Sequence, residues 1–169
     1  MARAKRRLGI SDVLEEFIET VFILNGFFYL CTENKTGLEN KLIMDFHYTL
    51  KIAADPEEVF AALTTPFQIE LWSGYPADMK AEKGYVFSLW EGDITGVNLD
   101  VKINRLLVQE WFFGEQEEQS IVRIELKKEG GYTIVNLEHS HIPEEVFEEI
   151  TEGWREYYLG AIKGMLEMY

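Results

Sequence analysis

The hydrophobic pattern changes period in the last third of the chain. Residues 132–141 are rich in β-branched side chains, which is typical of a half-buried strand. After Pro143, large apolar residues recur at steps of three and four from Val146 to Tyr169, which predicts one apolar face along a long helix. Such a helix needs a wide apolar partner, and a sheet formed by the preceding residues is the candidate. A curved sheet that holds one long helix often leaves space between the two, and that space is the candidate location of a functional site.

The pattern at the start of the predicted domain indicates one strand followed by two short helices. Residues 46–52 alternate apolar and polar side chains, as a strand with one buried face does. Asp55, Pro56 and Glu58 then have the order of a helix N-terminus: a capping residue, a proline at the first helical position and a glutamate at the third. A Thr-Thr-Pro sequence ends that helix, and residues 67–72 predict a second short one.

Five further strand-like segments follow in close succession, separated by turn residues. They comprise residues 85–90, 94–103, 106–113, 120–128 and 132–141. Strands so close in sequence pair as an antiparallel meander. The predicted fold class is therefore α+β with a helix-grip arrangement: a curved antiparallel sheet of six or seven strands wrapped around a long C-terminal helix, with two short helices after the first strand.

Composition and charge place the chain among folded proteins and exclude some partners. Hydrophobic residues make up 47% and aromatic residues 14% of the 169, which is enough for a substantial core. The formal net charge is −14, so nucleic acid and anionic membrane surfaces are poor partners. Residues 1–43 carry six basic and six acidic residues, whereas residues 44–169 carry 10 basic and 24 acidic ones. This shift predicts a domain boundary near Met44, between an N-terminal extension and one C-terminal domain.

Two interpretations of the N-terminal extension remain open. Either it forms an accessory amphipathic helix from Ser11 to Leu24, or it is upstream sequence that the natural product lacks, with Met44 as the true start. The apolar run at residues 21–31 is too short for a membrane span, which needs about 20 residues. The single cysteine, Cys31, excludes an internal disulfide and indicates a reducing, cytoplasmic setting.

Several short motifs along the predicted domain match a known family. They are Asp-Pro-Glu-Glu-Val-Phe at residues 55–60, Gly-Asp-Ile-Thr-Gly at 92–96, Leu-Val-Gln-Glu-Trp at 107–111 and Gly-Trp-Arg-Glu-Tyr-Tyr at 153–158. With the order of elements, they resemble the activator of heat-shock protein 90 ATPase homologue family (C-terminal-domain type), within the START and birch-pollen-allergen helix-grip (SRPBCC) superfamily. The resemblance covers residues 46–168 and implies that fold, with a heat-shock protein 90-type chaperone as a partner.

The resemblance implies the fold more directly than it implies the activity. The family motifs are structural rather than catalytic. The eukaryotic activator has a separate N-terminal domain that makes much of the chaperone contact, and residues 1–43 hold no counterpart of it. ATPase activation is therefore implied less directly than the helix-grip fold.

Alternation along the predicted strands indicates which side chains face the helix. With two aromatic residues of the helix, they are the candidate lining of a cavity for a small apolar ligand. These residues are Phe87, Leu89, Gln109, Trp111, Phe113, Ile124, Leu137, His139, Trp154 and Tyr158. The same set also fits a filled core, in which Gln109 and His139 are satisfied by each other, by tyrosine hydroxyls or by water. Trp72, Tyr75 and Trp90 lie near loops and act either as lids of a cavity or as ordinary packing.

The pattern offers little for catalysis or metal binding. His139 and His141 face the same way on their strand, but His47 lies on the opposite face of its own strand, so a third ligand is missing. No pair of carboxylates is directed inward, and no nucleophile has a base nearby in the pattern. Neither a metal nor a cofactor is predicted.

Three functions fit these features. The first is a non-enzymatic START-like domain that binds a small apolar molecule between the sheet and the C-terminal helix. The second, implied by the resemblance, is an accessory protein of a heat-shock protein 90-type chaperone in the stress response. The third is a cyclase-like or dehydratase-like enzyme that uses His139 as a general base, since a histidine in an apolar cavity can have a useful pKa.

Overall fold

The computed structural model describes residues 17–24, 27–34, 43–112 and 119–168. The chain divides into two units, residues 1–43 and 44–169, and each is described by itself.

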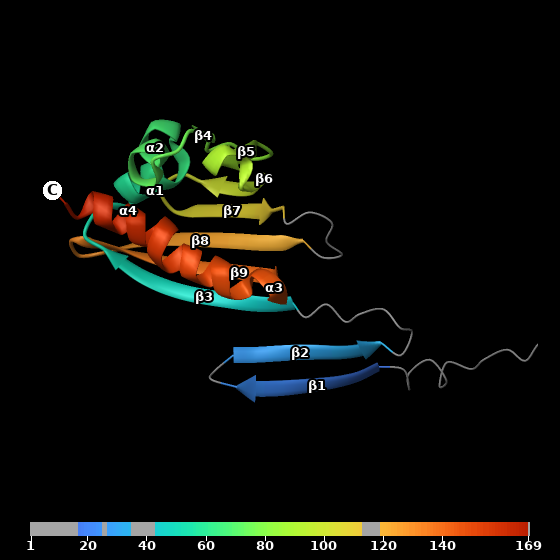
Figure 1. The fold of residues 1–169 in the computed structure, drawn as a ribbon. Helices are drawn as coiled ribbons and strands as arrows, with labels where there is room; N and C mark the ends of the chain where they lie inside the picture. The colour runs from blue at the N-terminus through green and yellow to red at the C-terminus, as the bar shows by residue number, and fades with distance from the viewer. Residues whose placement is uncertain (1–16, 25–26, 35–42, 113–118, 169) are drawn as a thin grey trace, which may run out of the picture. The chain divides into compact units, whose positions relative to one another are not determined.

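The first unit contains two antiparallel strands, β1 (Phe17–Leu24) and β2 (Phe27–Asn34) (Figure 1). The expectation of a helix from Ser11 to Leu24 is therefore wrong where the segment is described, and residues 11–16 lie outside the described part. The physical reason is the density of β-branched and aromatic residues, which favour strands. The Asn-Gly dipeptide at residues 25–26 of the sequence is also a strong hairpin signal, and it outweighs the helical spacing of a few apolar residues.

Seven strands form one antiparallel sheet in the second unit, in the order β3-β9-β8-β7-β6-β5-β4 (Figure 1). Strands β4 to β9 are a meander, as predicted, and β3 lies at the far edge beside β9. The α+β helix-grip prediction is confirmed, although the two-residue strand β4 was not expected. The strands are β3 (Ile43–Ile52), β4 (Ala77–Asp78), β5 (Val86–Leu89), β6 (Ile94–Lys102), β7 (Leu106–Trp111), β8 (Ser120–Glu129) and β9 (Tyr132–Pro143).

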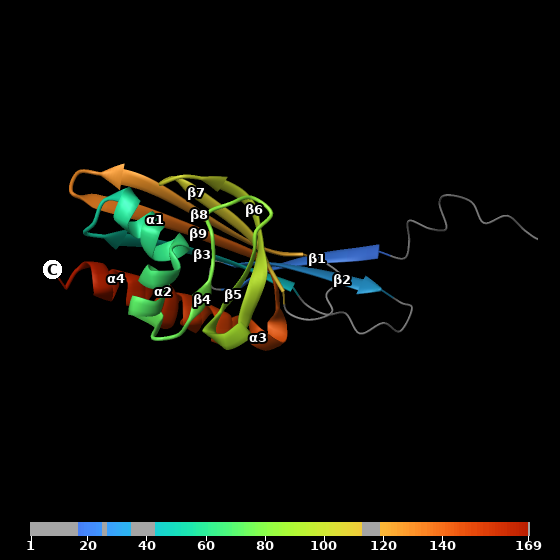
Figure 2. The same cartoon turned by 90° about the horizontal axis from the view of Figure 1, so that it is seen from above.

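Helices cover one face of this sheet. Two short helices follow β3, a short 3₁₀ turn follows β5, and three helical segments run without a break after β9 as the predicted long C-terminal helix. They are α1 (Pro56–Thr64), α2 (Pro66–Ser73), the 3₁₀ turn η3 (Trp90–Gly92), α3 (Glu144–Glu152), the π-helical segment η4 (Gly153–Tyr158) and α4 (Leu159–Leu166). The two views show the α1–α2 pair and the C-terminal helix on the same side of the sheet (Figures 1 and 2). No helix in the described part of the chain is long and apolar enough to cross a membrane.

The start of α1 follows the predicted signals. The backbone N–H of Asp55 donates to a carboxylate oxygen of Glu58 across 2.9 Å, and Pro56 is the first helical residue. Pro66 begins α2 directly afterwards, because a proline in the first turn has no intrahelical N–H bond to lose. Gly74 follows α2 with a φ of +77°, a left-handed conformation that glycine adopts at little cost.

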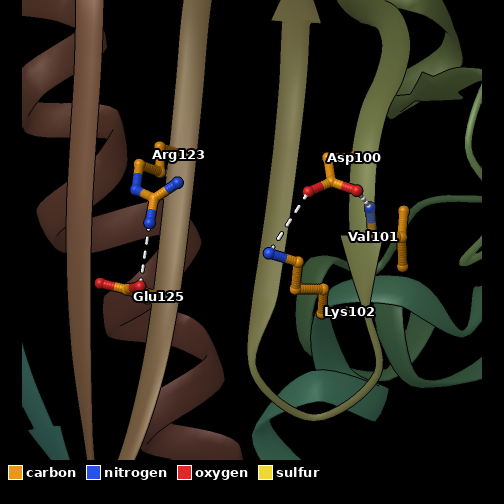
Figure 3. Close-up of polar contacts among 5 residues, drawn as sticks. All are labelled: Asp100, Val101, Lys102, Arg123 and Glu125. Atoms are coloured by element: carbon orange, nitrogen blue, oxygen red, sulfur yellow. Dashed lines mark hydrogen bonds and ion pairs between the residues drawn. The ribbon is translucent and has the colours of Figure 1, made fainter.

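The two faces of the sheet differ as the alternation predicts. On β8, Val122 and Ile124 are fully buried on the helix side. Arg123 and Glu125 lie on the opposite face and form an exposed ion pair of 2.9 Å (Figure 3). Exposed ion pairs contribute about 0–1 kcal/mol, so burial of the apolar face holds the sheet and the helices together.

A β-bulge in β6 shifts this alternation by one residue. Its register against β7 changes between Asn98 and Asp100. Asn98 is fully buried, whereas Asp100 is on the outer face, 3.8 Å from Lys102, and Val101 packs against the core (Figure 3). Without the extra residue, strict alternation would place Asp100 on the same inner face as Asn98.

Candidate functional site

A buried chain of hydrogen bonds fixes the indole of Trp111. Its Nε1–H donates to Oε1 of Gln109 at 3.1 Å, and Nε2 of Gln109 donates to Oδ1 of Asn98 at 2.9 Å. Nδ2 of Asn98 donates in turn to the carbonyl oxygen of Lys80 at 2.7 Å. Both amides are fully buried, so these bonds replace the water that each side chain gives up on folding.

A second buried chain fixes the indole of Trp154. Its Nε1–H donates to Nδ1 of His139 at 3.0 Å, so Nδ1 is an acceptor and the imidazole proton lies on Nε2. Nε2 then donates to Oγ of Ser120 at 2.9 Å, and this hydroxyl donates to the carbonyl oxygen of Ser140 at 3.2 Å. Burial lowers the pKa of His139 to about 3, because the charged form would lose its hydration. His139 is therefore neutral near neutral pH.

Gln109 and His139 thus have partners other than those considered from the sequence. Each bonds to a tryptophan and to a polar residue of a neighbouring strand, rather than to each other or to a tyrosine hydroxyl of the described residues. The amide partner of Gln109, Asn98, lies opposite it in the register of β6 and β7, next to the bulge. Both polar residues are parts of the packed interior.

The histidines of β9 do not form a metal site with the residues that the structure describes. Nδ1 of His141 lies 2.9 Å from the carbonyl oxygen of Gln119, and His141 has a φ of +56°, which interrupts the strand alternation. Across residues 43–112 and 119–168, no group of three or more histidine, cysteine, aspartate or glutamate residues is placed to hold a metal ion.

Five aromatic side chains, which we call the aromatic cluster, gather where the C-terminal helix crosses the sheet. The ring centroid of Tyr158 lies 4.6 Å from that of Trp154 and 4.8 Å from that of Trp72. Trp90 meets Tyr158 edge-on at 5.6 Å, and Trp111 stacks on Trp154 at 4.8 Å. Aromatic pairs of this kind contribute about 0.5–1.5 kcal/mol each beyond the burial of their area. The cluster therefore ties α2, η3 and β7 to η4.

The π-helical turn η4 presents Trp154 and Tyr158 to this cluster. A π turn has one more residue per hydrogen-bonded ring than an α turn, and such turns are frequent at functional sites. Gly160 makes the turn sterically allowed, because a Cβ at this position would lie 2.2 Å from the carbonyl oxygen of Arg155, five residues earlier. The sequence thus has a glycine where the widened turn brings the carbonyl group of Arg155 close to the backbone of residue 160.

A pocket of about 350 Å³ lies beside the aromatic cluster, between the η3–β6 corner and the C-terminal helix. This volume is near the lower end of the range of about 300–1,000 Å³ that is typical of small-molecule sites. Ile94, Ile150 and Gly153 complete the apolar part of its wall. The aromatic part consists of Trp90, Trp111, Trp154, Tyr157 and Tyr158.

Three carboxylates also line the pocket: Asp93 after η3, and Glu149 and Glu152 on α3. All three residues are solvent-exposed, so they stand at the mouth, whereas Trp111 and Trp154 are 3% and 2% exposed. Among the lining residues that the structure describes, none is a lysine, an arginine or a histidine. The pocket therefore combines an apolar, aromatic depth with a negatively charged entrance.

Trp90 reaches the pocket through a strained backbone. Its φ is +48°, and that of the following residue, Glu91, is +56°. A left-handed conformation costs an L residue about 1–2 kcal/mol. The contacts of the Trp90 indole with Trp72 and Tyr158 offset this cost. Since backbone strain concentrates at functional sites, it supports this pocket as the candidate site.

Tyr158 holds a buried hydroxyl that has no hydrogen-bond partner among the described residues. Its side chain is 2% exposed, and burial raises the pKa of the phenol, so the hydroxyl stays protonated. A buried polar atom without a partner costs about 1–3 kcal/mol, and most such atoms are paired. The hydroxyl oxygen of Tyr158 is enclosed by protein, so this residue lines the pocket through the rest of its side chain.

The residues predicted to line a cavity divide between this pocket and the core. Trp111, Trp154 and Tyr158 line the pocket. Phe113 lies outside the described residues. The other six are buried in the core and are not part of the pocket wall: Phe87, Leu89, Gln109, Ile124, Leu137 and His139.

Sequence reasoning missed the acidic side of the pocket. The sequence pattern marks Asp93 only as part of the Gly-Asp-Ile-Thr-Gly motif, and it indicates Trp90 only as a lid or as packing. Glu149 and Glu152 lie three residues apart on the predicted helix, on either side of the apolar position Ile150. That spacing places both carboxylates on the same side of a helix, and this signal could have found them.

Comparison with known proteins assigns most of the chain to one family. Residues 53–167 match the family described as Activator of Hsp90 ATPase homolog 1-like protein. The chain belongs to this family. The match includes both short helices, the η3–β6 corner and the C-terminal helix, so every element that lines the pocket of this activator-family domain lies within it.

Two curated relatives show how far the named members of the activator family differ from this chain in sequence. The human activator of 90 kDa heat shock protein ATPase homolog 1 is 28% identical over 110 residues, which are 64% of this chain and 32% of the relative. The mouse homolog 2 is 25% identical over 124 residues, 72% of this chain and 38% of the relative. This activator-family chain therefore spans about a third of the length of the curated relatives it matches.

A solved structure supports the same assignment. The crystal structure of an HSP90 activator from Plasmodium falciparum has a TM-score of 0.68 and 27% sequence identity, and the match covers 73% of this chain and 96% of that one.

Proposed function

We propose that this activator-family domain is a non-enzymatic binding module that holds a small, largely apolar molecule in the pocket beside the aromatic cluster. The observation that carries the proposal is the pocket, with about 350 Å³ and five aromatic wall residues. The strained backbone of Trp90 adds support, because residues held in rarely populated backbone conformations cluster at functional sites. The proposed ligand site is thus at the side of the C-terminal helix rather than around Gln109 and His139.

The geometry of His139 favours binding over catalysis. Its ring nitrogens bond to Trp154 and Ser120, its pKa is about 3, and it is not part of the pocket wall. A general base must reach the proton that it removes and must have a pKa near the working pH. The cyclase-like alternative therefore has no support from this residue, and the human and mouse relatives are described as activators of an ATPase.

Gly153 offers a way to block the pocket without damaging the fold. It lines the pocket, has helical φ and ψ of −52° and −47°, and a Cβ added there would meet no atom within 4 Å. Gly153→Leu therefore fills part of the pocket while it improves helix propensity. Gly164→Leu is the matched control, because Gly164 is exposed on α4, has similar free space and does not line the pocket.

Native mass spectrometry of the full chain, purified without refolding, tests the proposal. We expect a small-molecule adduct on the wild-type chain and on Gly164→Leu, and none on Gly153→Leu. Bare chain masses for all three proteins, together with no ligand-induced shift in a screen of apolar compounds, would overturn the proposal.

A second candidate function is that of an accessory protein of a heat-shock protein 90-type chaperone. Family membership favours it, as do the descriptions of the human and Plasmodium falciparum relatives as activators of such a chaperone or its ATPase. The net charge of −14 suits a basic surface on the partner. The test is the ATPase rate of a chaperone of this type at saturating concentrations of this protein; an unchanged rate would rule out activation.

A further inference from the structure

We propose that the ligand of the pocket carries a quaternary ammonium group, or a similarly methylated cationic group, on a small apolar body. This inference rests on the ligand binding proposed for the same pocket, and it adds the charge and the chemical class of the ligand. It is carried by the combination of aromatic walls and carboxylates at the mouth.

The aromatic walls supply the surface that such a cation recognises. Trp90, Trp111 and Trp154 line one pocket together with Tyr157 and Tyr158. The face of an aromatic ring carries negative charge density and attracts a cation, most strongly for tryptophan, and aromatic cages of this composition bind methylated ammonium groups. Both buried indoles donate their N–H groups to Gln109 and His139, so neither N–H is left to meet a ligand.

The carboxylates at the mouth determine the preferred sign of the ligand. Asp93, Glu149 and Glu152 line the pocket, and no ion pair involving them occurs in the described part of the chain. Three uncompensated negative charges beside one pocket repel an anion and give a neutral ligand no advantage. A cation in the pocket neutralises part of this charge, and the net charge of −14 attracts it over a longer range.

The distribution of hydrogen-bond acceptors selects a methylated cation over a primary ammonium. A primary ammonium has three N–H donors that lose their water on burial and need acceptors. The carboxylates are exposed and the hydroxyl oxygen of Tyr158 is enclosed by protein, so the depth of the described lining offers no side-chain acceptor that a ligand can reach. A quaternary ammonium has no N–H donor to satisfy.

Choline and its neutral carbon isostere, 3,3-dimethylbutan-1-ol, separate charge from shape. Both probes are titrated into the full chain while the indole N–H resonances are followed by NMR. We expect choline to bind about tenfold more tightly than the alcohol, as one favourable cation–π site allows. The preference should shrink as salt is added, because the carboxylates are exposed and screened.

Variants at the mouth test the assignment of the charges. The double variant Glu149→Gln/Glu152→Gln keeps the size of both side chains, and we expect it to weaken choline binding at least threefold and to leave binding of the alcohol unchanged. Glu148→Gln is the matched control, because Glu148 is exposed on the same helix and does not line the pocket. It should bind both probes as the wild type does.

The outcomes separate this inference from the proposed function. Preferential binding of choline that falls in the double variant and not in the control supports both. Equal or tighter binding of the alcohol, lost in Gly153→Leu, overturns the cationic ligand and keeps the binding function. If neither probe shifts any resonance at millimolar concentration, the cationic ligand is overturned, and the adduct test on Gly153→Leu decides the binding function independently.

Discussion

The indole of Trp154 and the imidazole of His139 are joined by a hydrogen bond of 3.0 Å, in which the indole N–H donates and Nδ1 accepts. An indole nitrogen can only donate, so this bond exists only while Nδ1 carries no proton. Protonation of His139 would set two donors against each other in a fully buried place. The bond therefore couples the attachment of the C-terminal helix to the charge of one histidine.

Acid is expected to destabilise the domain through His139. Its pKa is about 3 in the folded protein and 6.5 in its ordinary state, so between these values the unfolded chain binds a proton that the folded chain does not. Above the higher value this group has no effect on stability. As the pH falls below it, the free energy of unfolding decreases by up to about 1.4 kcal/mol per pH unit. Urea unfolding measured at intervals between neutral pH and the onset of carboxylate titration checks this slope.

The control for this pH dependence is a pair of glutamine variants. His139→Gln removes the titrating group, and we expect the slope in that interval to disappear even though the variant is less stable overall. His47→Gln changes an exposed histidine on β3 and should keep the slope. A slope of the same size in His139→Gln would show that another group is responsible.

Gln109→Met tests the first polar chain. Methionine fits a similar volume, but it removes the acceptor of the Trp111 indole and the donor to Asn98, all in a fully buried site. We expect a loss of about 2–5 kcal/mol in the free energy of unfolding, since each buried group deprived of its partner costs about 1–3 kcal/mol. Denaturant midpoints measured at constant m-value give this number.

Gln119→Met is the matched surface variant for that measurement. Gln119 is exposed, and its side-chain bond to Glu110 spans 3.2 Å. Its replacement should change stability by less than about 0.5 kcal/mol, as is usual for surface positions. Equal losses in the two variants would mean that the buried chain contributes no more than any exposed amide bond.

The sequence predicts the fold where local signals and burial agree. The capping order at Asp55, Pro56 and Glu58 specifies the start of α1, because each residue satisfies a local backbone requirement that no tertiary contact opposes. Alternation likewise predicts the buried faces of β7 and β8, since one face of each strand must meet the helices. These predictions are confirmed because a period of two or of 3.6 is a property of the local chain.

The pocket depends on backbone features that leave no periodic pattern of apolar and polar residues in the sequence. Its location was not predicted for this reason. Trp90 reaches it through a positive φ, and Asn98 reaches its partner Gln109 next to a one-residue bulge. Neither feature changes the pattern of apolar and polar positions. The β1 segment shows the opposite case, in which apolar spacing resembles a helix while β-branched composition favours the observed strand.

The π turn can be tested through the two glycines that follow it. In Gly160→Ala the new Cβ would lie 2.2 Å from the carbonyl oxygen of Arg155, a backbone atom that cannot rotate away. We expect this variant to lose about 1–3 kcal/mol of stability, the usual cost of overpacking. Gly164→Ala adds the same methyl group where nothing lies within 4 Å, and it should gain about 0.5–1 kcal/mol from helix propensity.

A loss of stability in Gly160→Ala together with a gain in Gly164→Ala distinguishes a π turn from a regular α-helix. In an uninterrupted α-helix, both alanines would stabilise the protein to a similar extent, because both remove backbone freedom from the unfolded chain. Thermal and urea unfolding of the two variants side by side therefore measure the turn directly. Since η4 carries the pocket residues Trp154 and Tyr158, a destabilised Gly160→Ala variant should also lose affinity for any pocket ligand, whereas Gly164→Ala should bind as the wild type does. Stabilisation by both substitutions would mean that the helix continues without the widened turn.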